Sequence, residues 1–65
     1  MLVISFQQLA QKNPIAAAAM IEDGADPPDC TILEHEDSSF SFHGPDGDVY
    51  EWDDSDATWY NMTGD

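Results

Sequence analysis

Acidic residues are confined to the C-terminal two thirds of this 65-residue chain. Residues 1–21 contain no Asp or Glu, whereas residues 22–65 contain all fourteen acids and no Lys or Arg. Lys12 is the sole Lys or Arg, so the net charge is −13. Self-repulsion of this size opposes a compact fold, and solubility alone requires a net charge of only about 2–8 in a small domain. We therefore expect the excess charge to serve the binding of a partner.

The composition nevertheless favours a folded protein over a disordered acidic tail. Hydrophobic residues make up 42% of the chain and aromatic residues 11%, which is more than disordered acidic segments carry. A chain of this length has a small core that contributes only a few kcal/mol of stability. We predict one small domain spanning residues 1–65.

The compartment is predicted from the cysteine content and the N-terminal segment. Cys30 is the only cysteine, so an internal disulfide is excluded and a reducing environment is favoured. No apolar run approaches the roughly 20 residues of a membrane span, and the start MLVISFQQLAQKN lacks the basic leading segment of a signal peptide. We expect a cytoplasmic protein that does not bind membranes.

Two helix starts are encoded in the acid-free third. Ser5 and Gln8 have the spacing of a capping box, and Asn13 followed by Pro14 is a favourable second start. Gly24 is placed as a helix-ending glycine. The sequence therefore predicts two short helices, over residues of about 5–12 and 14–23.

After Pro27-Pro28 the hydrophobic pattern changes to the period of two that is typical of strands. Gly44-Pro45-Asp46-Gly47 is a strong turn signal. We predict an α+β fold in which a three-stranded antiparallel meander, with strands at about 30–36, 39–43 and 48–53, has one face covered by the two helices. The core is predicted to contain Phe40, Phe42, Tyr50 and Trp52, together with Ile32 or Leu33.

Residues 54–62 are ambiguous between a helix and a fourth strand. Asp54 or Ser55 has the side chain of a helix cap, whereas ATWYNM also has strand character. We favour a short helix over residues 55–61.

Catalytic and metal-binding patterns are weak. Cys30 has His35 and His43 as candidate partners, but no oxyanion-hole signature accompanies them. A calcium loop starting at Asp46 would need glycine at its sixth position and glutamate at its twelfth, where this chain has Glu51 and Ala57. We predict a protein that is not an enzyme and that has no metal or cofactor.

The segment PDGDVYEWDDSD, residues 45–56, combines charge with aromatic residues. If Tyr50 and Trp52 face the core, strand alternation places Glu51 and Asp53 outward. We expect Glu34 and Glu36 to share a face nearby, so that two rows of carboxylates on adjacent strands, with residues about 6.6 Å apart along each strand, imitate the phosphates of DNA. The predicted partner-binding residues are Glu34, Glu36, Asp37, Asp46, Asp48, Glu51, Asp53, Asp54 and Asp56, opposite Lys and Arg of a basic DNA-binding surface.

In length, in its MLVISFQQLAQKNP opening and in its acidic aromatic PDGDVYEWDDSD segment, the chain resembles small phage-encoded anti-CRISPR proteins, and in particular type I-C inhibitors. The resemblance implies a monomeric DNA mimic in the bacterial host cytoplasm that binds the multi-subunit surveillance complex and blocks target DNA recognition. It implies no direct contact with nucleic acid. Anti-CRISPR proteins share no common signature, so no catalytic residues carry over.

Three other interpretations stay open. The protein could inhibit another DNA-binding enzyme, such as a uracil-DNA glycosylase or a restriction enzyme. It could instead act allosterically by docking through its acid-free N-terminal helices. A disordered acidic segment with interspersed aromatics, resembling a transcriptional activation tail, is the third.

Overall fold

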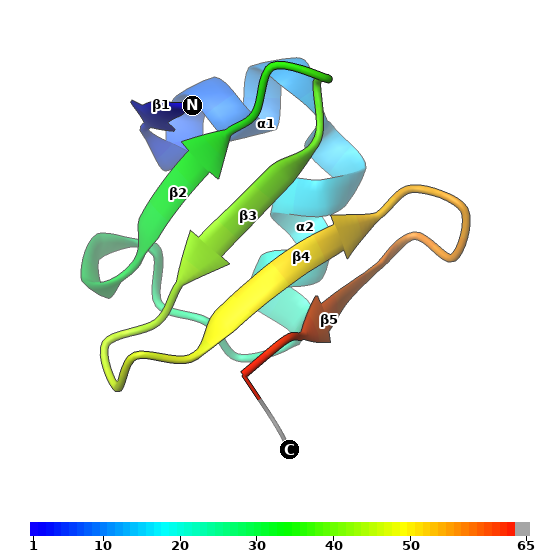
Figure 1. Ribbon diagram of the computed structural model, residues 1–65. Helices are drawn as coiled ribbons and strands as arrows, with labels where there is room; N and C mark the ends of the chain where they lie inside the picture. Colours follow the sequence, from blue (N-terminus) through cyan, green and yellow to red (C-terminus); the bar gives the residue numbers. More distant parts are fainter. Residues whose placement is uncertain (64–65) are drawn as a thin grey trace.

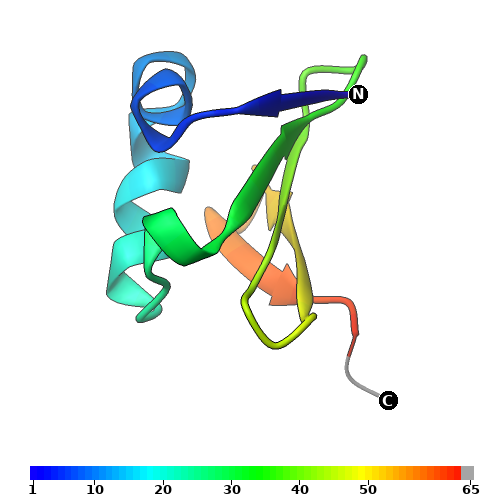
Figure 2. The same cartoon turned by 90° about the vertical axis from the view of Figure 1, so that its left-hand side faces the viewer.

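The computed structural model describes residues 1–63 and packs two helices against one face of a five-stranded antiparallel sheet (Figures 1 and 2). The sheet order is β1-β2-β3-β4-β5. The α+β class is therefore confirmed, whereas the predicted number of strands is wrong. In chain order the elements are β1 (Leu2–Ile4), α1 (Phe6–Lys12), α2 (Pro14–Glu22), the 3-10 helix η1 (Pro27–Asp29), β2 (Thr31–Glu34), β3 (Phe40–His43), β4 (Val49–Asp53) and β5 (Thr58–Asn61).

Both helices begin at the predicted caps. The Gln8 amide donates to the Ser5 hydroxyl at 3.0 Å, and the Ser5 amide donates to the Gln8 side chain at 2.8 Å, which completes the capping box. The Asn13 side chain accepts from the Ala16 amide at 3.1 Å, with Pro14 at the first turn of α2. Gly24 has a φ of +87°, as expected for a helix-ending glycine.

The three predicted strands are present as β2, β3 and β4, each slightly shorter than expected. The turn between β3 and β4 is closed by a hydrogen bond of 3.1 Å from the Gly47 amide to the Gly44 carbonyl. Gly47 has a φ of +91°, a conformation that favours glycine. This turn is therefore correctly predicted from its Gly and Pro residues.

The helix expected over residues 55–61 is wrong, because this segment forms β5. The Asp53 carboxylate accepts from the amides of Ser55 at 2.9 Å and Asp56 at 3.2 Å, and Ala57 has a φ of +52°. An Asp that accepts from following amides occurs both at helix starts and in turns. Here it starts a turn, and β5 then pairs with β4 so that Trp59 lies opposite Trp52.

β1 is a second strand that the sequence did not predict. It has three residues and pairs with β2, with Val3 opposite Leu33 and Ile4 opposite Ile32. So short an apolar run has no measurable period. Its strand conformation depends on pairing with β2, a segment that follows both helices in the sequence.

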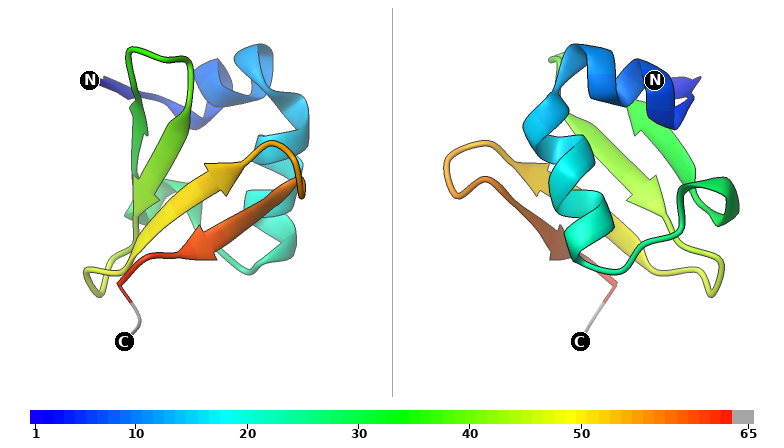
Figure 3. Two further views of the ribbon diagram at one scale, coloured as in Figure 1. Left: turned by 45° about the vertical axis from the view of Figure 1, so that its right-hand side comes forward. Right: turned by 180° about the vertical axis from the view of Figure 1, so that it is seen from behind.

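The core lies between the helices and the inner face of the sheet, which Figure 3 shows from two sides. Phe40, Phe42 and Trp52 are buried as predicted, and of the two alternatives Ile32 is buried while Leu33 is half-buried. Tyr50 is half-buried against the same core. The other buried apolar residues are Ile4, Leu9, Ala16, Ala17, Met20 and Trp59.

No helix in the described part of the chain has the length and apolar character needed to cross a membrane.

Candidate functional site

The predicted contact residues lie at two ends of the sheet and at one point between them. We call the end of the sheet where the β2–β3 and β4–β5 turns lie the upper end, as oriented in Figure 1. The opposite end, where the β3–β4 turn lies, is the lower end. Glu51 lies on β4 between them and is exposed. The upper end contains Glu34, Glu36, Asp37, Asp53, Asp54 and Asp56, and the lower end contains Asp46 and Asp48.

Four acids that were not among the predicted contacts also belong to the lower end. They lie at the end of α2 and in the segment that leads to β2, and they are Glu22, Asp23, Asp26 and Asp29. All four are exposed. The lower end is therefore as acidic as the upper end.

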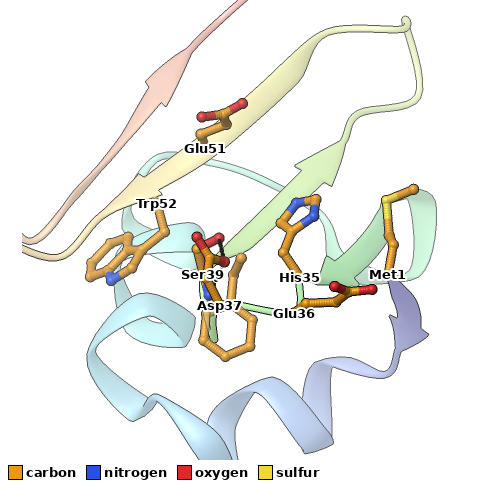
Figure 4. Close-up of a pocket in the computed structure, with 8 residues that line it drawn as sticks. Met1, His35, Glu36, Asp37, Ser39, Glu51 and Trp52 are labelled. Carbon is orange, nitrogen blue, oxygen red and sulfur yellow. Dashed lines mark hydrogen bonds between the residues drawn. The ribbon is translucent and has the colours of Figure 1, made fainter.

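Two neighbouring hollows bring acids of the upper end together. One, of about 620 Å³, is lined by Glu36, Asp37 and Glu51 along with His35 and Met1 (Figure 4). The other, of about 550 Å³, is lined by Glu34, Asp37, Asp54 and Lys12. Carboxylates from β2, β4 and both turns thus converge on one region.

The expectation of two carboxylate rows on adjacent strands is wrong. β3 separates β2 from β4, and Glu34 pairs with the buried Phe40, which places Glu34 on the helix-facing side. On the outer face, Glu51 lies opposite Ser41 of β3. The upper end is acidic because strand ends and turns carry the carboxylates, not because strands display them in rows.

Ser41 and His35 form a contact in the middle of the outer face that sequence reasoning missed. The Ser41 hydroxyl is 2.8 Å from His35 Nε2, and Ser41 is 4% exposed. Their spacing in the sequence carries no signal for this pair, because the β2–β3 register brings them together. The contact satisfies two polar groups within the sheet, and the burial of Ser41 leaves no access for a substrate at its hydroxyl.

Glu34 is held by the only Lys or Arg of the chain. Lys12 Nζ lies 3.1 Å from both carboxylate oxygens of Glu34, and the side chains are 46% and 18% exposed respectively. The sole Lys or Arg charge is therefore neutralised by one of the candidate acids. A partner that binds here therefore contacts a Glu34 carboxylate that is already paired with Lys12.

Four other candidate acids also accept hydrogen bonds within the protein. Asp53 accepts from two turn amides, Asp54 accepts from Trp52 Nε1 at 3.2 Å, and Asp56 accepts from the Tyr60 hydroxyl. Asp37 accepts from the Ser39 hydroxyl at 2.6 Å and from the Ser39 amide at 3.2 Å. These two bonds lower the pKa of Asp37 below its usual value.

The remaining candidate acids make no side-chain hydrogen bond or ion pair within residues 1–63. Glu36, Asp46 and Glu51 are exposed, and Asp48 is half-buried. Of the nine predicted contacts, these four have carboxylates whose full hydrogen-bonding capacity is open to a partner.

Cys30 does not have the surroundings of an activated nucleophile. Burial raises the pKa of the Cys30 thiol, a backbone hydrogen bond at Asp26 lowers it, and the carboxylates of Asp26, Asp29 and Asp46 raise it again. Reactive cysteines instead have a depressed pKa and electropositive neighbours. Within residues 1–63, no three His, Cys, Asp or Glu side chains are grouped to hold a metal ion.

Comparisons with protein-family models, with curated proteins and with solved structures found no match for this chain.

Proposed function

We propose that this protein is an anti-CRISPR inhibitor that binds a type I surveillance complex and blocks recognition of target DNA as an acidic mimic of the duplex. It acts as a monomer in the bacterial cytoplasm, carries out no chemistry and does not touch DNA itself. Its carboxylates take the place of phosphates opposite Lys and Arg of the DNA-binding surface.

The density of negative charge is the observation that carries this proposal. The net charge is −13 and the longest extent is 29 Å, or one net charge per about 2.2 Å, compared with one per roughly 1.7 Å of duplex axis. A basic groove that attracts DNA attracts such a surface for the same electrostatic reason.

The upper end supports the proposal as the contact surface. Glu36 and Glu51 belong to one hollow and have unpaired carboxylates within the described residues. The Asp37 hydrogen bonds shape the β2–β3 turn that lines this hollow, and the Asp53 hydrogen bonds shape the β4–β5 turn, whose Asp54 lines the neighbouring one. Because these carboxylates lie on a paired sheet and on closed turns, little backbone conformational entropy is lost when a partner binds.

Competition with target DNA tests the proposal directly. Binding of a fluorescent target duplex to a purified type I-C surveillance complex is measured by anisotropy as the protein is added. Wild type should displace the duplex, and Glu36→Gln/Glu51→Gln should weaken inhibition about tenfold, because each lost ion pair contributes up to roughly 1 kcal/mol.

The matched control is Glu22→Gln/Asp29→Asn, which changes the net charge by the same amount at the lower end and should inhibit like wild type. Inhibition should also weaken steeply as salt is added, since phosphate-directed contacts do so. Equal effects of the two double variants, or no displacement by wild type, would contradict the proposal. Parallel assays with uracil-DNA glycosylase and a restriction enzyme separate this target from other DNA-binding enzymes.

Exposed apolar side chains favour a second candidate, an allosteric inhibitor that docks through its N-terminal third. Val3 and Ile15 are 73% and 63% exposed, and neither lines the two acidic hollows of the upper end. Val3→Ser/Ile15→Ser would then abolish inhibition, with little dependence on salt, while Glu36→Gln/Glu51→Gln would retain it.

A further inference from the structure

A hollow of about 510 Å³ opens at the lower end, between the segment that follows α2 and the β3–β4 turn. Figure 3 shows these two segments in its view from behind, at the foot of the sheet. Its volume falls within the roughly 300–1,000 Å³ of ligand-binding pockets. The hollow at the lower end is lined by the aromatic residues Phe42, Tyr50 and Trp59, and none of these three lines either hollow of the upper end.

The aromatic wall of this hollow is rigid. Tyr50 stacks on Phe42 with ring centroids 4.7 Å apart and an angle of 10° between the planes. Trp59 meets Phe42 edge to face at 4.8 Å, and its indole is fixed by a buried hydrogen bond to the Ala16 carbonyl. Phe42 and Trp59 are buried and Tyr50 is half-buried, so Tyr50 offers the accessible ring surface.

Four carboxylates line the same hollow from two sides. Asp23 and Asp26 come from the segment after α2, and Asp46 and Asp48 come from the β3–β4 turn. Lys12, the only Lys or Arg, is paired with Glu34 at the opposite end. The raised pKa of the nearby Cys30 has contributions from Asp26 and Asp46, which agrees with a negative potential in this region.

We propose that this hollow binds an arginine side chain of the partner protein. The carboxylates on its two sides favour a cationic occupant, and the half-buried Tyr50 ring favours a flat one. A guanidinium stacks on aromatic rings and donates several hydrogen bonds to carboxylates in a fixed plane, whereas an ammonium is a compact and strongly hydrated charge. The inference deepens the proposed function, because it rests on a partner with a basic DNA-binding surface.

Binding of an arginine in the hollow would add a buried contact to the interface, which exposed carboxylates that imitate phosphates do not provide. Exposed ion pairs contribute little to affinity individually, whereas an arginine buried in a pocket is a frequent hot spot of protein interfaces. The upper end would then attract the basic surface, and the hollow would hold one of its arginines.

A blocked tripeptide, acetyl-Gly-Arg-Gly-amide, is the probe. The same peptide with citrulline in place of arginine is its neutral isostere, and the same peptide with lysine is a cationic comparison without the planar group. Titration is followed by the indole N–H signals in a proton–nitrogen NMR spectrum. The arginine peptide should shift the signal of Trp59, which reports on the hollow, more than that of Trp52, which lines the upper end and packs against Trp59 with ring centroids 5.2 Å apart. The citrulline and lysine peptides should bind at least about fivefold more weakly.

Asp46→Asn/Asp48→Asn should weaken binding of the arginine peptide about tenfold, and Glu22→Gln/Asp29→Asn is the control of equal charge outside the hollow. If the double variant loses the signal dispersion of a folded protein, Asp46→Asn alone serves, since Asp46 is exposed. Equal binding of the citrulline or lysine peptide, a shift of Trp52 in place of Trp59, or unchanged affinity of the Asn variants would overturn the assignment.

The peptide titration contains no surveillance complex, so its outcome is independent of the proposed function. If the protein displaces target DNA but does not bind the arginine peptide, the arginine site is refuted and the proposed inhibition stands. If it binds the arginine peptide but does not displace DNA, the arginine site stands and the proposed inhibition is refuted.

Discussion

Trp59 and Ala16 are 43 residues apart in the chain and are joined by a buried hydrogen bond of 2.9 Å from the indole Nε1 to the Ala16 carbonyl. Ala16 is completely buried and Trp59 is 6% exposed. The bond connects β5, the last strand, to α2 across the core. It therefore couples the acid-rich C-terminal hairpin to the acid-free N-terminal third of the chain.

Removing this bond should destabilise the protein measurably. Trp59→Phe should lower the free energy of unfolding by about 1–3 kcal/mol, because the variant loses a buried donor and leaves a packing defect. Trp52→Phe is the matched control, since the Trp52 indole donates to the exposed Asp54. Urea denaturation followed by fluorescence measures both changes, and an equal or larger loss in Trp52→Phe would refute the prediction.

The Lys12–Glu34 ion pair should contribute only modestly to stability. A double-mutant cycle with Lys12→Met and Glu34→Gln isolates the pair from the general repulsion that each single change also alters. We expect a coupling free energy of about 0.2–1 kcal/mol that decreases as salt is added, since the Lys12 side chain is 46% exposed. A coupling above about 2 kcal/mol would show that the pair behaves as a buried one.

The Tyr60 phenol should titrate above the usual pKa of a tyrosine. Its hydrogen bond to Asp56 and the charge of that carboxylate raise the pKa of Tyr60 above its usual value of 10.0. Because the folded state favours the protonated phenol, this contribution to stability is present below pH 10.0 and is lost as the pH rises through the folded-state pKa. Asp56→Asn should lower the pKa of Tyr60 back toward 10.0, as measured by carbon NMR of the tyrosine ring. An unchanged pKa in that variant would exclude Asp56 as the cause.

Salt should act in opposite directions on folding and on binding. Twelve of the fourteen acids lie at the two ends of a small sheet, so screening should relieve repulsion and raise the urea midpoint. The same screening should weaken capture by a basic partner. Denaturation and DNA competition between about 0.05 and 0.5 M sodium chloride measure both trends, a range over which the Debye length falls severalfold. A midpoint that decreases with salt would contradict the role assigned to repulsion.

The local elements could be predicted where short-range chemistry decides them. Ser5, Asn13 and Gly24 mark helix ends through contacts within a few residues, and Gly44 and Gly47 close a tight turn in the same way. β1 and β5 could not be predicted with the same reasoning. One is too short to show a period, and the other begins with an Asp53 turn that resembles a helix cap.

For the candidate site, the inward direction of Trp52 and the outward direction of Glu51 followed from strand alternation and are confirmed. Strand alternation did not predict which groups lie next to each carboxylate, because β3 lies between β2 and β4, the two strands that contain the predicted acids. Of the four acids of the hollow at the lower end, Asp46 and Asp48 were among the predicted contacts, whereas Asp23 and Asp26 had only the faint signal of lying on either side of a helix-ending glycine.

The excess of acids, their absence from the first third and the alternation of aromatic residues with acids along β4 can be read directly from the amino-acid order. Which carboxylates are already paired, which are free and which line a hollow with an aromatic wall depends on how distant segments pack. Capping, turn formation and alternation act over a few residues, whereas the pairing of Lys12 with Glu34 and the convergence of Asp23 with Asp46 require the strands and helices to be packed first.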